Sequence, residues 1–196
     1  MKLFYNPASP YVRKVMGCAI ACGLESRIEK VATNPWESPP GLLAQNPLSK
    51  VPCLVTEDGV ALFDSPVICE YLDHVGAGAL FPPPGAARWR ALKLQAVGDG
   101  IMDAAVLRRL ESNRPAEEAR TATMERYHAA VTRALDLLER DPSLDHLDIG
   151  TLSVACALGY LDFRFGHEDW RGGRPTLEKW SAAMEQRPEI AGTRPA

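Results

Sequence analysis

The segment NPLSKVPCLVTEDGVALFDSPVICEYL, residues 46–72, decides which fold the chain can adopt. Two apolar runs flank TEDG (56–59), and an Asp-Gly step between apolar runs predicts a β-hairpin. A helix is expected to follow from Pro66 to about His74, because proline favours the first helical position. The apolar side chains predicted to face inward on this helix are Val67, Ile68, Tyr71 and Leu72.

The residues before this segment predict an alternation of strands and helices. KLFY (2–5) is a short apolar strand candidate, and 10–22 has apolar residues at helical spacing with Gly23 as a C-terminal cap. RIEKVAT (27–33) predicts a second strand, and 37–47 predicts an irregular or short helical connection. The first 75 or so residues therefore have the order β-α-β-α-β-β-α, a compact mixed α/β unit.

The sequence pattern changes after this unit, from short strands and helices to a Pro-rich segment and long helical patterns. GAGALFPPPGAA (76–87) contains three consecutive prolines, which is typical of a stiff linker. We predict a first domain at 1–76, a linker at 77–86 and an all-helical second domain at 87–196, a bundle of about five helices. Its clearest helical patterns are 87–113, 115–141, 151–165 and 175–188.

Composition excludes several classes of protein. The formal net charge is -3, without the Lys and Arg excess of nucleic-acid binding proteins. No apolar run reaches the ~18 residues of a membrane span, and the N-terminal residues lack the apolar region of a signal peptide. We therefore expect a cytoplasmic protein with no nucleic-acid or membrane partner.

The five cysteines are scattered and lie in apolar surroundings, which favours reduced core thiols. Cys18 and Cys22 lie one helical turn apart, so a metal or redox pair is the alternative. No histidine or second cysteine pair completes a ligand set, and we predict no metal site.

Three Pro-containing steps suggest a binding site. Ser9-Pro10 and Ser65-Pro66 each open a helix, and Asp64 precedes the second; a helix start offers free N–H groups to an anion. Between them, Val51-Pro52 precedes a strand, and a cis bond there would turn the Val51 backbone outward to pair with a peptide. Glutathione would satisfy all three features, although a capping hydroxyl at Ser9 needs no further role.

The same residues resemble the cytosolic glutathione S-transferases. SPYVRKV (9–15) looks like the family's active-site helix start, 46–72 looks like its glutathione-binding segment, and the Pro-rich linker falls where the family has one. The resemblance implies a thioredoxin-like N-terminal domain, an all-helical C-terminal domain and a homodimer. It also implies a transferase with glutathione as co-substrate, serving detoxification or a dedicated pathway.

The resemblance assigns roles to individual residues. Ser9 matches the catalytic hydroxyl, which would donate a hydrogen bond to the glutathione thiolate. Pro52 matches the cis-proline, and Val51 before it would pair with the cysteinyl backbone. The remaining glutathione contacts implied are Asp64 and Ser65 at the γ-glutamyl end and Lys50 at the glycyl carboxylate.

Two departures from the family pattern stand out. Thiol-transferring relatives have Cys where Ser9 stands, and Val12 is not a second Cys, so disulfide exchange is disfavoured. Many relatives begin the central helix of the second domain with a Thr-x-x-Asp capping box, and TLSV (151–154) lacks the acid.

The electrophile is expected to lie against the first long helix of the second domain. Met102, Val106 and Arg109 are its predicted lining at helical spacing, or else ordinary core and surface residues. The leading hypothesis is conjugation of glutathione to small hydrophobic electrophiles. The alternatives are a glutathione-dependent peroxidase or isomerase on the same site, and a non-catalytic interaction protein with this fold.

Overall fold

The computed structural model describes residues 1–78 and 80–195, so Ala79 of the predicted linker and Ala196 of the predicted second domain lie outside it. The chain divides into two compact units. The first is Met1–Gly85 together with the segment that begins at Pro188, and the second is Ala86–Arg187. The predicted second domain thus differs from the second unit at its C-terminal end.

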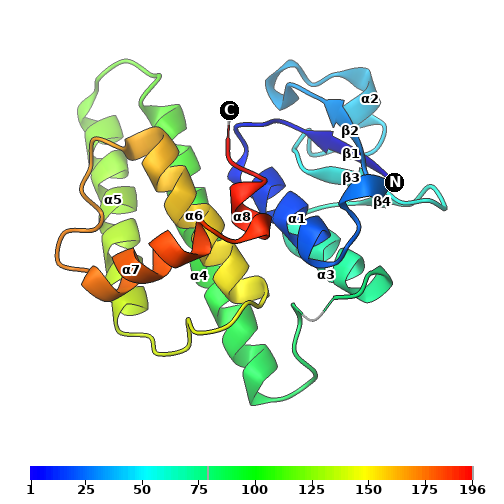
Figure 1. Ribbon diagram of the computed structural model, residues 1–196. Coiled ribbons are helices and arrows are strands. Elements are labelled where there is room, and N and C mark those ends of the chain that lie inside the picture. Colours follow the sequence, from blue (N-terminus) through cyan, green and yellow to red (C-terminus); the bar gives the residue numbers. More distant parts are fainter. Residues whose placement is uncertain (79, 196) are drawn as a thin grey trace. The chain divides into compact units, whose positions relative to one another are not determined.

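The first unit is built on a four-stranded sheet of order β2-β1-β3-β4 (Figure 1). Strand β1 pairs with β2 in parallel, and the other two pairings are antiparallel. The order β-α-β-α-β-β-α is confirmed, and with it the thioredoxin-like fold class. The bounds are β1 Lys2–Tyr5, α1 Pro10–Ala21, β2 Glu29–Ala32, α2 Pro40–Leu43, β3 Cys53–Val55, β4 Ala61–Leu62 and α3 Ser65–Val75.

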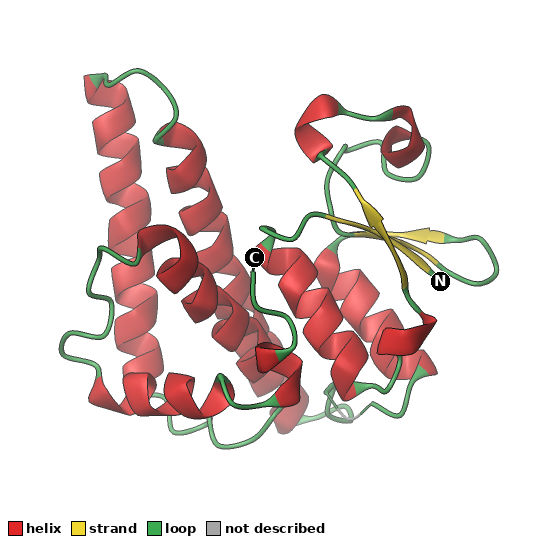
Figure 2. Cartoon of the chain, turned by 45° about the horizontal axis from the view of Figure 1, so that its top comes forward, coloured by secondary structure: helices red, strands yellow, loops and turns green. Residues whose placement is uncertain are grey.

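Helix α1 packs against α3 and against α8 (Pro188–Ala191), a short helix from the end of the chain (Figures 1 and 2). Gly23 has φ of +70°, a left-handed conformation that favours glycine and ends the helix as predicted. Arg13 is buried, and its Nη2 donates a hydrogen bond to the Ile190 carbonyl at 3.1 Å. The first unit is therefore completed by residues from both ends of the chain.

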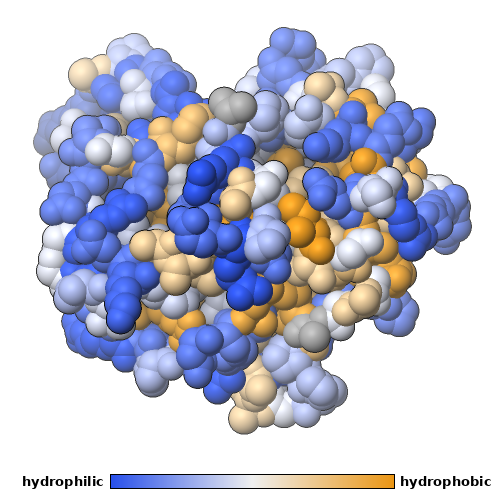
Figure 3. All heavy atoms as spheres, in the orientation of Figure 1, coloured by the Kyte–Doolittle hydropathy of each residue, from blue (hydrophilic) through white to orange (hydrophobic). Residues whose placement is uncertain are grey.

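Helix α3 buries Ile68 and Leu72 as predicted, but the expectation for Val67 was wrong, because its side chain is 46% exposed. The helix begins one residue earlier than expected, with Asp64 as N-cap and Ser65 in the first turn. Val67 belongs to a set of exposed apolar side chains of the first unit. The other large members of this set are Trp36, Leu43, Leu48, Val60 and Val75. Hydrophobic residues are visible at several places on the face of the molecule that Figure 3 shows.

The second unit is helical in the part that the structure describes, with four helices. Their bounds are α4 Ala86–Glu111, α5 Glu118–Glu139, α6 Ile149–Phe165 and α7 Pro175–Met184. Helix α4 packs along α6 and α5, and α7 packs on α5 and α6 (Figure 2). Helix α6 is buried on almost every side, as its nearly all-apolar sequence requires.

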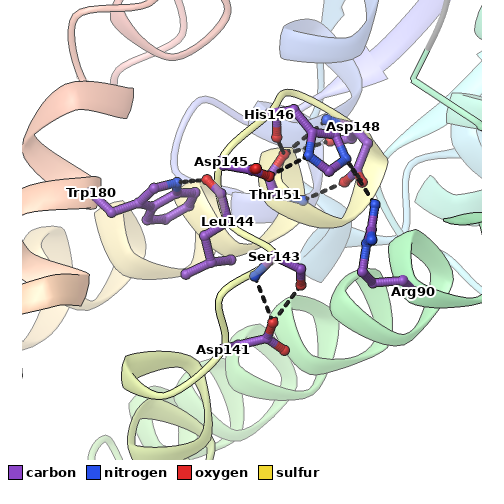
Figure 4. Close-up of polar contacts among 9 residues, drawn as sticks. All are labelled: Arg90, Asp141, Ser143, Leu144, Asp145, His146, Asp148, Thr151 and Trp180. Atoms are coloured by element: carbon purple, nitrogen blue, oxygen red, sulfur yellow. Dashed lines mark hydrogen bonds and ion pairs between the residues drawn. The ribbon is translucent and has the colours of Figure 1, made fainter.

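A capping box begins α6, although TLSV (151–154) lacks the acid of the family's usual pattern. The Thr151 N–H donates to Asp148 Oδ1 and the Asp148 N–H donates to Thr151 Oγ1, both at 2.9 Å (Figure 4). The acid is the N-cap and the threonine is the third helical residue, the reverse of the order sought in TLSV. Either side chain can accept a hydrogen bond from the other residue's backbone N–H. Exchanging the positions of the acid and the threonine therefore preserves both hydrogen bonds.

Two glycines allow α4 and α6 to approach closely. A Cβ built on Gly98 would lie 2.6 Å from the Ser153 carbonyl carbon, and one on Gly150 would lie 2.4 Å from the Ala91 carbonyl oxygen. These neighbours are backbone atoms, which cannot rotate away. The two helices therefore pack backbone against backbone at these points.

We expect Gly98→Ala to destabilise the protein by about 1–3 kcal/mol through overpacking. Gly100→Ala is the matched control on the same helix, because a Cβ there meets no atom within 4 Å. That control should stabilise by about 0.5–1 kcal/mol, since alanine is the better helix former. Urea unfolding of both variants measures the difference, and equal midpoints would contradict the close contact.

Candidate active site

Strand register brings three predicted binding elements to one end of the sheet. Phe4 of β1 is opposite Cys53 of β3, and Leu54 of β3 is opposite Leu62 of β4. The loop 6–9 after β1, the Val51-Pro52 step before β3 and the Phe63-Asp64 step after β4 therefore leave the sheet at the same end. Neighbouring strands lie ~5 Å apart, so these segments are close in space. We call this end of the sheet the loop edge.

Ser9 lies at the loop edge as the N-cap of α1 and is half-buried. Its Oγ accepts a hydrogen bond from the Val12 N–H at 3.3 Å, and its own N–H donates to the Asn6 carbonyl at 3.0 Å. Accepting this bond leaves the hydroxyl hydrogen without a protein acceptor among residues 1–78 and 80–195. Ser9 can therefore cap the helix and donate a hydrogen bond to a ligand at the same time.

The Val51–Pro52 peptide bond is cis, as the resemblance implies, and Val51 is half-buried while Pro52 is buried. Within the described part of the chain, the N–H and carbonyl of Val51 form no hydrogen bond. Buried or half-buried backbone groups normally have partners. The Val51 backbone is thus available to an extended ligand laid along β3.

Asn46, which the sequence analysis did not single out, holds the loop that leads to Val51. It is 1% exposed; its Oδ1 accepts from the Leu48 N–H at 3.0 Å, and its Nδ2 donates to the Lys50 carbonyl at 2.9 Å. Asparagine commonly organises a turn in this way, and the Asn-Pro step was the available signal. Asn46 therefore positions Lys50 and Val51.

Asp64 and Ser65 form the third element of the loop edge. The Asp64 carboxylate is exposed and makes no capping bond to α3, although Asp64 occupies the N-cap position. Ser65 is 2% exposed, and no described residue is hydrogen-bonded to its hydroxyl. Together they offer a carboxylate, a hydroxyl and the positive end of a helix dipole.

The other predicted site residues are more scattered. Lys50 is exposed beside Val51 and can extend toward an anion. On α4, Met102 is fully buried, whereas Val106 and Arg109 are half-buried. Met102 therefore offers little surface to a ligand, and Val106 and Arg109 offer more.

The cysteines of the described residues are all free and buried. Burial raises the pKa of Cys53, next to Pro52, to about 11, so its thiol is neutral near pH 7. Cys18 and Cys22 have their Sγ atoms 4.0 Å apart, and the hydrogen bond between them lowers the pKa of Cys22 and raises that of Cys18. Neither lies at the loop edge, so a thiolate at Ser9 would come from a ligand.

Two kinds of feature are absent from the regions described. No group of three His, Cys, Asp or Glu side chains is arranged to hold a metal ion. No helix combines the length and the apolar character needed to cross a membrane.

Family models match both halves of the chain. The model of the glutathione S-transferase N-terminal domain matches residues 8–75, and that of the glutathione S-transferase C-terminal domain matches 117–183. The uncharacterized GST-like protein YibF of Escherichia coli K12 is 36% identical over 201 residues, covering 100% of this chain and 98% of YibF.

Solved structures give the same result. A glutathione transferase family member from Pseudomonas fluorescens Pf-5, with bound glutathione, superposes with a TM-score of 0.93 at 43% identity, covering 100% of this chain and 98% of that one. Another structure of a family member from that organism contains S-(propanoic acid)-glutathione, with a TM-score of 0.89, 43% identity and full coverage of both chains. A glutathione S-transferase from Methylobacillus flagellatus KT with glutathione bound has a TM-score of 0.89 at 33% identity, covering 100% and 99%.

Proposed function

Because the chain belongs to the glutathione S-transferase family, we propose that it binds glutathione at the loop edge and transfers it to small hydrophobic electrophiles. One observation carries this proposal. Three sets of polar groups with unused hydrogen-bonding capacity, as far as residues 1–78 and 80–195 show, meet at one end of the sheet: the Ser9 hydroxyl hydrogen, the Val51 backbone and the Asp64-Ser65 pair.

Glutathione would occupy these groups in a defined order. The backbone of its cysteinyl residue pairs with Val51 as an added strand, and its γ-glutamyl amine and carboxylate meet Asp64 and Ser65 at the start of α3. Lys50 reaches the glycyl carboxylate. The thiol then lies at the start of α1, beside Ser9. Bound glutathione in the Pseudomonas and Methylobacillus relatives supports this ligand.

Ser9 acts as a hydrogen-bond donor to the bound thiolate. A free thiol has a pKa of about 8.5, so about 1–3% is ionised at neutral pH. A hydrogen bond to a charged group contributes roughly 1.5–3 kcal/mol, and the helix end adds about 0.3–1. At 1.36 kcal/mol per unit, the pKa of the thiol falls by about one to three units, so the ionised fraction at pH 7 rises from about 3% to between about one quarter and nearly all.

The chemistry is a nucleophilic conjugation. The thiolate sulfur forms a bond to the electrophilic carbon, and the electrophile's leaving group departs with the bonding electrons or its double bond takes up a proton. We assign Val106 and Arg109 of α4, with Met102 behind them, to the electrophile side. The S-substituted glutathione bound by a Pseudomonas relative is the kind of molecule that such a reaction produces.

Calorimetry with glutathione tests the binding step, and a panel of electrophiles tests the reaction. We expect measurable binding of glutathione and turnover of aryl halides. No binding heat and no thermal protection would favour the non-catalytic interpretation. Turnover confined to hydroperoxides or maleyl compounds would replace conjugation by the peroxidase or isomerase alternative.

Asp64→Asn is expected to raise the KM for glutathione about tenfold, because it removes the charge that faces the γ-glutamyl amine. The kcat should change less, since the thiol lies at the other end of the tripeptide. Glu57→Gln is the matched control: it removes an exposed carboxylate of the same unit, one that is paired with Arg27. Equal KM values in the two variants would contradict the assignment of Asp64.

We further propose that the protein is a cytoplasmic homodimer. The exposed Trp36, which is 71% exposed, supports self-association, because tryptophan is enriched at protein–protein interfaces. The five free thiols support a reducing compartment.

A further inference from the structure

Four side chains form a cationic and aromatic cluster in the second unit, which we call the arginine–tyrosine cluster: Arg109 on α4, and Tyr160, Phe163 and Arg164 on α6. The three α6 residues are spaced i, i+3 and i+4, so they share one face of the helix. Their contacts are close. The Arg164 guanidinium carbon lies 4.1 Å from the Phe163 ring centroid, and the Tyr160 and Phe163 centroids are 6.5 Å apart.

Across residues 1–78 and 80–195, neither Arg109 nor Arg164 forms an ion pair with a carboxylate. Nearby arginines of the same unit behave differently. Those on the segment after α6 are paired, with Arg171 at 2.7 Å from Asp162 and Arg174 at 2.6 Å from Asp136.

The polar groups of the cluster are only partly satisfied. Arg109 donates to Ser112 Oγ at 3.2 Å and to Asn113 Oδ1, both neutral acceptors. The Nε of Arg164 is buried and has no hydrogen-bond partner among the described atoms. A buried, unpaired guanidinium N–H is costly.

Tyr160 adds a hydroxyl donor to the two cations. Its side chain is 6% exposed, and burial raises the pKa of its phenol, with the nearby charges of Arg164 and Arg109 opposing that effect. The phenol is therefore protonated near neutral pH and can donate a hydrogen bond. Both arginines also lie close enough to Tyr160 for their charges to lower the pKa of its phenol. Arg109 of α4 and the α6 residues are therefore neighbours.

The nearest carboxylates in sequence are engaged elsewhere. Asp162 accepts hydrogen bonds from Arg171 and from Trp170 Nε1, and Glu111 pairs with Arg114 at 3.1 Å. They do not neutralise the cluster. It therefore retains two positive charges beside an aromatic surface and a phenolic donor.

We propose that the arginine–tyrosine cluster binds a carboxylate on the electrophile, so that the preferred substrates are aromatic or unsaturated acids. The substrate class rests on the proposed transferase function, whereas the anion site lies wholly within α4 and α6. Guanidinium groups bind carboxylates through two parallel hydrogen bonds, which neutral analogues cannot form. Phe163 provides the surface for the substrate's apolar part.

A pair of aryl chlorides tests this proposal in the full-length protein: a chlorodinitrobenzoate and the matching chlorodinitrobenzamide. In both, the glutathione sulfur forms a bond to the ring carbon, the C–Cl bond breaks, chloride leaves with the electron pair and the thiol proton goes to solvent. The carboxylate or amide takes no part in the bond changes. The two electrophiles therefore differ in the charge presented to the cluster.

We expect Arg164→Gln to raise the KM for the benzoate about ten- to hundredfold and to change the KM for the benzamide by less than about twofold. The ratio of the benzoate KM to the benzamide KM should rise in Arg109→Gln as well. In Arg164→Lys this ratio should return part of the way to the wild-type value. Arg133→Gln is the matched control, because it removes an exposed arginine of α5 in the same unit.

Calorimetry with nitrobenzoate and no glutathione separates this proposal from the transferase function. Binding that is lost in Arg164→Gln supports the anion site even when neither chloride is turned over. Turnover of both chlorides with an unchanged KM ratio in Arg164→Gln and Arg109→Gln overturns the anion site and leaves the transferase function standing. A nitrobenzoate affinity equal in wild type and both variants also overturns it.

Discussion

Replacing Ser9 with alanine is expected to lower turnover near pH 6.5 by about 10- to 50-fold, while the affinity for glutathione stays within about twofold. The reason is the charge-assisted hydrogen bond that the hydroxyl donates to the sulfur. Without that bond, the pKa of the bound thiol rises toward the value of about 8.5 for a free thiol. Fewer bound molecules are then ionised at low pH.

The dependence of kcat/KM on pH measures this effect. A lowered thiol pKa keeps the thiolate present down to lower pH, so the wild-type profile should reach its plateau one or more units earlier than the variant's. Above the variant's thiol pKa the two rates should converge. Full activity of Ser9→Ala near pH 6.5 would falsify the proposed role of the hydroxyl.

The helix cap needs its own control. Ser9 Oγ also accepts from the Val12 N–H, so the alanine variant should lose about 1 kcal/mol of stability. Ser9→Thr retains a hydroxyl that can both cap and donate. It should keep the wild-type pH profile, and its melting temperature should stay close to that of wild type.

Asp148→Ala is expected to destabilise the protein by about 2–3 kcal/mol. The carboxylate caps α6, is 1% exposed and also lies 3.2 Å from His146 Nε2 through its Oδ2 (Figure 4). Its removal leaves the buried Thr151 N–H without its acceptor, which costs about 1–3 kcal/mol. The loss affects the most buried helix of the second unit.

Urea unfolding measures this loss, with Asp145→Ala as the matched control. Asp145 also contacts His146, at 2.6 Å, but its side chain is 78% exposed, so its removal should cost less than about 0.5 kcal/mol. The comparison isolates the buried cap from the surface contact. Similar midpoints for the two variants would show that the capping box contributes little.

The order of strands and helices was predictable because short-range signals specify it. Asp58-Gly59 and Gly23 adopt the turn and cap conformations that their residue types favour, with φ of +83° at Gly59. The error at Val67 arose at a helix start. Val67 lies in the first turn of α3 and about 100° around the helix axis from the buried Ile68, so it lies at the edge of the buried face, where the residue type alone does not determine burial.

The capping box of α6 was missed for a different reason. Its two side chains accept from each other's backbone, so the order of acid and threonine can be exchanged without loss of a bond. The pattern with threonine first and the acid three residues later does not match this box, in which Asp148 comes first and Thr151 follows. The structure identifies the box because it shows which N–H groups need partners.

The groups of the candidate site were only partly predictable. Ser9, Val51 and Asp64 each follow or precede a recognisable turn, and strand pairing brings those turns to one end of the sheet. The roles of Asn46 and of the arginine–tyrosine cluster were not predicted, because they depend on which polar side chains have hydrogen-bond or ion-pair partners in the packed structure. That information is not contained in residue spacing.

The return of α8 to α1 has a consequence for biosynthesis. The helix that presents Ser9 keeps one flank uncovered until residues 188–191 have been translated, because Ile190 is fully buried and accepts from Arg13. Domains generally form in the order in which the ribosome makes them. The first unit is therefore completed only after the ribosome has synthesised the second unit.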